Sequence, residues 1–104
     1  MVRQFDVCPN PDPETRDAHP YLVVLQSDAL KYIDTRVVAP LVGPKKIQFF
    51  ERLLPEVTLN GSRYVVAVPD LAAISTTQLA SPVGNLEEYR DRFIGAIDLV
   101  FTGV

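Results

Sequence analysis

The sequence predicts an α+β fold that is mainly β, with about five strands followed by one helix. Three observations lead to this prediction. Apolar and β-branched residues gather in short runs, proline and Asn-Gly signals separate these runs, and a stripe with helical spacing comes only near the end of the 104 residues. Strands followed by a helix are typical of an α+β domain, or of a small barrel with a helix packed on it.

The first strands are expected at residues 4–8, 21–26 and 35–41. In the first segment, Phe5 and Val7 alternate with polar residues and share one face. The second segment is apolar almost throughout, which predicts a strand covered on both faces. In the third segment Pro40 indicates an edge position or a bulge, because proline has no N–H for a central ladder.

Between the first two strands, residues 9–13 contain three prolines. Prolines at this density do not fit inside a helix or a central strand. We therefore expect residues 9–20 to form an exposed hairpin connection.

Residues 56–59 and 63–68 predict a β-hairpin. Asn60 and Gly61 lie between them, and an Asn-Gly pair tolerates the positive φ angles of a tight turn. Residues 71–79 contain short apolar pieces that indicate a further strand.

Two interpretations stay open for residues 43–54. Ile47, Phe50 and Leu54 have helical spacing, and Pro44 can begin a helix. The segment is short, however, and Pro55 bounds it, which favours an irregular excursion.

Residues 85–101 predict the helix. Asn85 can cap its first amides, and Glu88 completes a capping-box pattern. Gly103 is placed to end the helix. The apolar stripe comprises Leu86, Tyr89, Phe93, Ile97 and Val100 or Phe101. The apolar end, residues 99–101, exceeds what one narrow stripe buries, which is consistent with a two-fold interface.

Bulk properties predict a single domain over residues 1–104 in the cytoplasm. The hydrophobic fraction of 47% supports a packed core. No signal peptide or membrane-spanning run is evident, and the single cysteine fits a reducing compartment. The net charge is −3 and Lys45-Lys46 is the only basic pair, so direct binding of nucleic acid or of a membrane is not expected.

The side chains that carry chemistry do not form a catalytic set. His19 precedes Pro20 in the proline-rich loop, and Cys8 ends a strand without a neighbouring base. These two residues are too few for a zinc site, and the glycines do not have the spacing of a phosphate-binding loop. We therefore predict no catalytic residue, no metal and no cofactor, and a protein that is not an enzyme.

Three stretches in order resemble the CcdB family of toxins. They are residues 21–28 with the ending Gln26-Ser27-Asp28, residues 35–41, and residues 96–104. The resemblance spans nearly the whole chain. It implies a small SH3-like barrel with an added antiparallel sheet and a C-terminal helix, and it favours the irregular excursion at residues 43–54.

The resemblance also implies a function and its partners. Such toxins act as homodimers that bind the A subunit of DNA gyrase and trap gyrase on cleaved DNA. A cognate CcdA-like antitoxin wraps the dimer through a disordered segment and releases it from gyrase.

A plasmid-borne member of the family ends in Trp-Gly-Ile, which carries the poisoning. Thr102, Gly103 and Val104 correspond to these residues, and Phe101 precedes them. Threonine thus stands in place of a tryptophan, a residue type that buries roughly 200 Å² at an interface. Ala29-Leu30 stands in place of two isoleucines that contact gyrase.

The loop after the first strand lies on the antitoxin side in the family. The implied antitoxin contacts are Pro11, Asp12, Glu14 and Arg16. This loop is longer than in the plasmid-borne toxin, so the choice of partner can differ.

Two alternatives to gyrase poisoning stay open. Ribonuclease toxins share this barrel, so the fold alone does not exclude RNA cleavage. The second alternative is a regulatory member that binds only the antitoxin, which the threonine at position 102 motivates.

Overall fold

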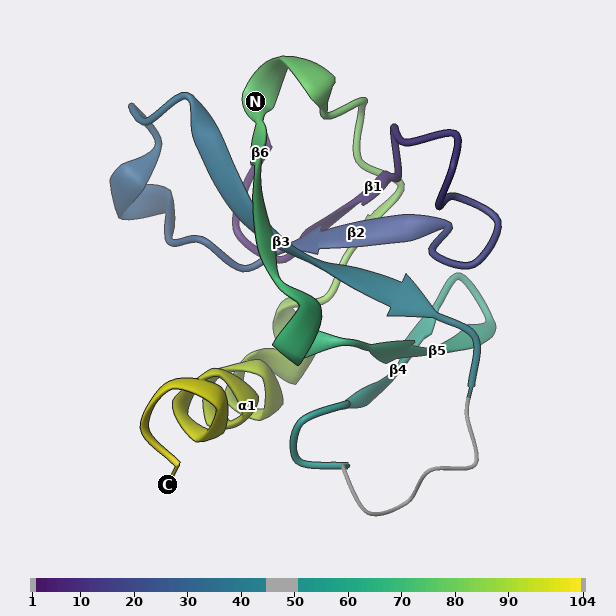
Figure 1. Cartoon of the computed structure of the whole chain (residues 1–104), viewed down its shortest axis with the longest axis vertical. Helices are drawn as coiled ribbons and strands as arrows, with labels where there is room; N and C mark the ends of the chain where they lie inside the picture. The colour runs from purple at the N-terminus through teal and green to yellow at the C-terminus, as the bar shows by residue number, and fades with distance from the viewer. Residues whose placement is uncertain (1, 45–50, 104) are drawn as a thin grey trace.

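The computed structural model describes residues 2–44 and 51–103. Its strands form one antiparallel sheet in the order β4-β5-β3-β2-β1-β7, with β6 paired to β3, and this sheet curls into a nearly closed barrel (Figure 1). The helix α1 packs against the barrel at the C-terminal end. The predicted fold, α+β and mainly β, is confirmed.

The described residues contain seven strands, one α-helix and short 3₁₀ turns. The strands are β1 (Asp6–Pro9), β2 (Tyr21–Val24), β3 (Thr35–Val42), β4 (Glu56–Leu59), β5 (Ser62–Val66), β6 (Ala72–Ser75) and β7 (Gly84–Asn85). The helical elements are η1 (Asp28–Leu30), η3 (Val68–Asp70), η4 (Thr76–Gln78), η5 (Glu87–Tyr89) and α1 (Arg90–Thr102).

Pro40 lies inside the sheet, so the predicted edge position is wrong. On one side β3 pairs with β2, and on the other side it pairs first with β6 and then with β5. The Pro40 carbonyl accepts from the Ala67 N–H at 2.9 Å, on the side of β6 and β5. The nitrogen of a strand residue points to the same side as its carbonyl, so the missing N–H of Pro40 falls in the gap between the end of β5 and the start of β6.

Both faces of β2 are buried, as predicted. Val23 and Leu25 face the main core, where Phe93 and Ala96 of α1 cover the barrel. The other face of β2 contributes to a second cluster. That cluster comprises Leu22, Val24 and Val38, with Val2, Ile74 and Leu79 packed against it.

The predicted hairpin is confirmed. Asn60 and Gly61 connect β4 to β5 and have φ angles of 50° and 84°. Both residues therefore have the left-handed backbone conformation, which matches the right-handed twist of the two strands.

The helix begins later than predicted. Asn85 belongs to β7, and its Oδ1 accepts from the Glu87 N–H at 2.8 Å in the turn that leads into η5. Its Nδ2 donates to the Gln4 carbonyl and to Asp6, which ties this residue to β1. The α-helix starts only at Arg90, after η5, because Asn85 and Leu86 are bonded to residues 4–6.

The end of α1 is confirmed. Gly103 has a φ of 75°, and its N–H donates to the Leu99 carbonyl at 3.1 Å. Along the predicted stripe, Leu86 and Phe93 are buried, whereas Val100 and Phe101 are exposed.

The connection at residues 9–20 is exposed but more regular than a plain hairpin loop. Pro9 is the last residue of β1, opposite Tyr21. A helical turn follows, in which the Arg16 N–H donates to the Asp12 carbonyl at 3.0 Å. The two interpretations of residues 43–54 fall largely on residues 45–50, which lie outside the described residues.

Candidate functional site

The C-terminal end of α1 exposes two apolar side chains, and Phe101 is the larger and the more exposed of them. Phe101 is 67% exposed and Val100 is 37% exposed. The Thr102 hydroxyl donates to the Asp98 carbonyl at 2.7 Å, so this short side chain folds back on the helix. Val104 lies outside the described residues. Phe101 is therefore the side chain that this end offers for contact with another protein.

Ala29 and Leu30 lie in η1, at the start of a loop over residues 28–34, here called the apolar loop. Both are exposed, and Leu30 is 48% exposed. The same loop exposes Tyr32 (86%) and Ile33 (49%), which the sequence analysis did not name. The signal for them was present, because three large apolar residues follow closely after turn residues.

Arg36 holds the apolar loop in place. Its side chain is only 6% exposed, and its guanidinium donates to the carbonyls of Lys31, Ile33 and Thr35. A planar guanidinium can bind several carbonyls in one fixed geometry. The loop is therefore braced from beneath while its apolar side chains face outward.

The two sets of residues that correspond to gyrase contacts lie apart in one subunit. Figure 1 shows the apolar loop on the upper left and the end of α1 on the lower left, well separated. One subunit therefore does not bring the apolar loop and the end of α1 together. A partner that touches both sets must be extended, or a second subunit must combine them.

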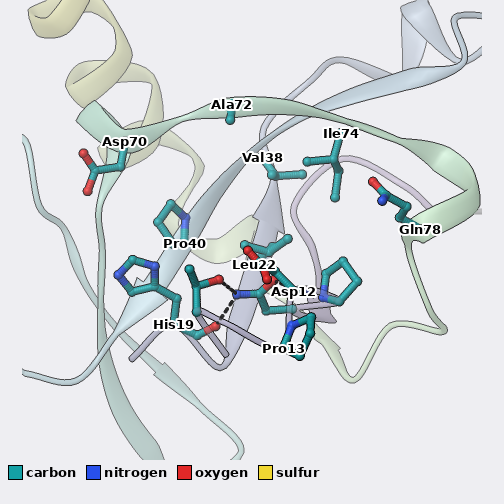
Figure 2. A pocket seen from close by; sticks show the side chains of 13 residues that line it. Asp12, Pro13, His19, Leu22, Val38, Pro40, Asp70, Ala72, Ile74 and Gln78 are labelled. Atoms are coloured by element: carbon teal, nitrogen blue, oxygen red, sulfur yellow. Dashed lines mark hydrogen bonds between the residues drawn. The ribbon is translucent and has the colours of Figure 1, made fainter. Parts of the chain in front are cut away.

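A groove of about 480 Å³ lies on the second face of the sheet (Figure 2). Leu22, Val38 and Pro40 form an apolar floor. One wall comprises Ala72 and Ile74 of β6 with Gln78, and Asp70 lies at its end. The opposite wall is the turn after β1, contributing Asn10, Pro11, Asp12, Pro13, Thr15 and His19.

Asn10 builds the wall that comes from the β1–β2 connection. Its side-chain Nδ2 donates to Thr15 Oγ1 at 3.0 Å and to the His19 carbonyl at 2.8 Å. Its Oδ1 accepts from the Asp12 N–H at 3.0 Å. Asn10 is 9% exposed, so one nearly buried amide fixes both ends of this turn.

The residues expected to contact the antitoxin divide into two groups. Pro11 and Asp12 line the groove. Glu14 and Arg16 are exposed and do not line it, and the Arg16 guanidinium donates to the Pro11 carbonyl at 3.2 Å. The groove itself was not foreseen, because β6 is distant from this loop in the sequence.

The groove has an acidic lining. Asp12 and Asp70 are among its lining residues, and no lysine or arginine is among its described lining residues. Figure 2 shows Asp70 at the end of the groove with its carboxylate turned outward. Asp12 also accepts from the Glu14 N–H at 2.9 Å, which fixes its carboxylate. A negative potential in this groove disfavours phosphates and favours cationic groups.

The described residues do not assemble a metal site or an activated thiol. No group of three or more metal-ligating side chains occurs among residues 2–44 and 51–103. Cys8 is fully buried, and burial, with a smaller effect from the Asp6 carboxylate, raises the pKa of its thiol to about 11. His19 is half-buried in the groove wall.

Among the helices the structure describes, none is long and apolar enough to cross a membrane.

Comparison with solved structures identifies the class of barrel. An endoribonuclease in complex with its cognate antitoxin, from a mycobacterial species, superimposes with a TM-score of 0.77 at 10% identity. The match covers 96% of this chain and 94% of the other. The two proteins therefore share a fold over nearly their whole lengths.

The family model described as "CcdB protein" matches residues 4–103. The chain therefore belongs to the CcdB family, which confirms the resemblance seen in the sequence. No curated protein sequence matched the chain.

Proposed function

We propose that this protein is the toxin of a toxin–antitoxin pair and that it acts by binding the DNA gyrase A subunit and trapping the complex of gyrase with cleaved DNA. The observation that carries the proposal is an exposed Phe101 at the end of α1 in a chain of the CcdB family. A large exposed aromatic side chain is a common anchor in protein interfaces.

The proposed gyrase surface has two parts. At the end of α1 it comprises Phe101, Thr102, Gly103 and Val104, and in the apolar loop it comprises Ala29 and Leu30. Phe101 supplies the aromatic contact, since Thr102 is small and bonded back to the helix. A homodimer is part of the proposal, because one subunit keeps the two parts apart. The proposed location is the cytoplasm.

The proposed activity is contact with another protein and not bond-making. The buried thiol of Cys8 has a raised pKa, which removes it as a nucleophile at neutral pH. No metal-ligand cluster occurs in the described part of the chain.

We place the antitoxin contact at Pro11, Asp12, Glu14 and Arg16. The related solved structure holds its cognate antitoxin, which supports a partner of this kind. The turn that carries these residues is internally bonded, so it presents a defined surface to a partner.

A supercoiling and DNA-cleavage assay with purified gyrase tests the proposal. The wild-type protein should stabilise cleaved DNA. Phe101→Ala should weaken binding to the A subunit at least about tenfold, because it removes an aromatic anchor. Val83→Ala, which truncates an exposed apolar residue in the β6–β7 connection, is the matched control and should leave binding unchanged.

Deletion of residues 102–104 should abolish poisoning while the domain stays folded, as judged by circular dichroism. Wild-type protein that neither binds the gyrase A subunit nor stabilises cleavage would exclude this target.

A ribonuclease is the second candidate, because the solved structure of similar fold is an endoribonuclease. The acidic groove counts against it, since RNA phosphates need cationic partners. Incubation with single-stranded RNA distinguishes the two, and sequence-specific cleavage that persists after repurification would replace the gyrase proposal.

A further inference from the structure

We propose that Tyr32 and Ile33 of the apolar loop form a second anchor for the gyrase A subunit, separate from Phe101. The ring of Tyr32 enters an apolar pocket of the partner, and Ile33 and Leu30 pack at its rim. The inference rests on the proposed function for the identity of the partner. It adds two contact residues that the sequence resemblance did not assign.

The apolar loop concentrates exposed apolar surface. Leu30, Tyr32 and Ile33 are 48%, 86% and 49% exposed within four consecutive positions. The other exposed large hydrophobic side chains in the described part of the chain are Val83, Val100 and Phe101, and none of them is as exposed as Tyr32. Single exposed apolar residues are ordinary, whereas a cluster of them marks a surface that another molecule covers.

Backbone hydrogen bonds hold the loop in one shape. The Leu30 N–H donates to the Ser27 carbonyl at 3.0 Å, and the Ile33 N–H donates to the Leu30 carbonyl at 3.0 Å. The Asp34 carbonyl accepts from the Thr76 N–H at 2.9 Å, which ties the far end of the loop to η4. The loop is therefore a bonded element that faces solvent.

Side chains fix the near end and the underside of the loop. The Asp28 carboxylate accepts from the Gln4 N–H at 2.8 Å, and the Ser27 hydroxyl accepts from the Ala29 N–H at 3.1 Å. The nearly buried guanidinium of Arg36 bonds to three carbonyls from beneath. A surface that is already fixed loses little conformational entropy when a partner binds, which favours a docking role.

The chemistry of Tyr32 suits an interface that forms and separates. The Lys31 ammonium lies 5.4 Å from the centroid of the tyrosine ring, and the side chain is otherwise open to solvent. A tyrosine offers an apolar ring with a polar tip, so it is stable both in water and in a partner's pocket. A permanent interface with a second copy would be more uniformly apolar, which favours a separate protein as the occupant.

The position of Tyr32 favours the same partner that Leu30 contacts in the proposed function. Ala29 and Leu30 belong to the same short loop, so a protein that covers them also reaches Tyr32 and Ile33. The loop lies well away from the end of α1, where two subunits are expected to meet (Figure 1). The loop is therefore open to gyrase in one subunit.

Biolayer interferometry with the purified gyrase A subunit tests the inference. Tyr32→Ala should weaken binding at least about tenfold, because it removes an aromatic anchor. Tyr32→Phe keeps the ring and should bind within about threefold of the wild type. Circular dichroism should be unchanged in both variants, since the side chain is exposed.

A second pair of variants matches exposure more closely. Ile33→Ala should weaken binding about fivefold, whereas Val83→Ala truncates an apolar residue of similar exposure in the β6–β7 connection and should not. In the double variant Tyr32→Ala with Phe101→Ala, the two losses should multiply, because the two anchors are separate.

Hydroxyl-radical footprinting tests the wild-type protein without any substitution. Tyr32 and Ile33 should react in the free protein and be protected in the complex with the A subunit, while Val83 stays reactive. Sedimentation velocity of Tyr32→Ala should match the wild type, because the loop does not join two copies.

Wild-type binding to the A subunit that Tyr32→Ala does not weaken, or a Tyr32 that stays reactive in the complex, would overturn this inference and leave the proposed function in place. A Tyr32→Ala protein that sediments as a smaller species would overturn it in favour of a contact between two copies. Wild-type protein that does not bind the A subunit would overturn the proposed function and this inference together.

Discussion

At the scale of single residues, the buried thiol of Cys8 makes the stability of the fold depend on pH. Its thiol lies opposite Leu22 in the sheet, on the face of β1 that turns away from Val7 and the main core. Burial raises the pKa of Cys8 from 9.0 to about 11. The thiol is therefore protonated and shielded at neutral pH.

We predict that Cys8 of the folded protein reacts with a thiol reagent at pH 8 more than about 100-fold more slowly than in denaturant. Above pH 9 the unfolded thiol loses its proton while the folded thiol keeps it. The folded state then binds more protons, so the free energy of unfolding falls between pH 9 and 11, by on the order of 2 kcal/mol.

Urea unfolding of the wild type and of Cys8→Ala across this range measures the effect. The wild type should lose more stability with rising pH than the variant does. Parallel pH profiles would show that the thiol is not protected by the fold.

Arg36 is a buried cation whose partners are carbonyl groups of the apolar loop. We predict that Arg36→Ala lowers the free energy of unfolding by about 2–3 kcal/mol, because it removes charged donors from these carbonyls. Arg36→Lys should be intermediate, because one ammonium group cannot reproduce the guanidinium fork.

Urea denaturation and amide exchange at residues 31–35 measure this prediction. Arg63→Ala, which removes an exposed ion pair with Glu56, is the control and should cost less than about 1 kcal/mol. A loop that exchanges no faster in Arg36→Ala would mean that the arginine does not brace it.

At the scale of elements, replacing glycine by alanine is expected to change stability in opposite directions in the β4–β5 turn and in α1. Gly61 has a φ of 84° in the β4–β5 turn, a conformation that alanine adopts at a cost of about 1 kcal/mol. Gly95 lies inside α1, is exposed, and has open space around an added methyl group. We predict that Gly61→Ala destabilises the protein, whereas Gly95→Ala stabilises it by roughly 0.5–1 kcal/mol.

Thermal and urea unfolding of the two variants measure these signs. A stabilising Gly61→Ala would contradict the turn geometry. A destabilising Gly95→Ala would indicate that this face of α1 is covered by a partner, such as a second subunit.

At the scale of the whole molecule, the exposed apolar end of α1 bears on whether the protein forms a dimer. Leu99 is half-buried, whereas Val100 and Phe101 are exposed next to it. We predict a homodimer at micromolar concentration, because such an apolar end supports a two-fold interface. Val100→Asp should shift the protein toward monomer without changing its circular dichroism, since the side chain is already partly exposed.

Sedimentation velocity measures both states. A stable dimer interface buries roughly 1,200–2,000 Å², so the dimer should persist on moderate dilution. A wild-type protein that sediments as a monomer at high micromolar concentration would remove the dimer from the proposal.

Much of the fold could be predicted because its signals are local. Asn60-Gly61 specifies its turn by the φ angles that these two residues tolerate, and Gly103 ends α1 in the same way. The apolar run of β2 predicted burial on both faces because few other environments suit it. The start of α1 failed as a prediction, since Asn85 bonds to β1 at the other end of the chain.

The candidate site was only partly foreseeable. The family resemblance named Phe101 and Leu30 as contact residues, and the structure shows that both are exposed. The bonds from Arg36 to the apolar loop were not predicted. Turn residues near Asp12 could have indicated the helical turn after β1, because Asp-Pro-Glu is a favourable start for one.

The sequence by itself determined the mainly β class, the Asn-Gly hairpin, the end of the helix and the CcdB family, because turn chemistry and side-chain periodicity act over a few neighbouring residues. Only the tertiary structure decided that Pro40 sits where β3 changes partners and that Phe5 bends the chain with a φ of 67° to set its ring against Phe93. It also decided that Asp12 and Asp70 share one groove. Strand pairing brings distant residues together, and the free energy that selects the pairing comes from burial of the whole core and not from any one segment.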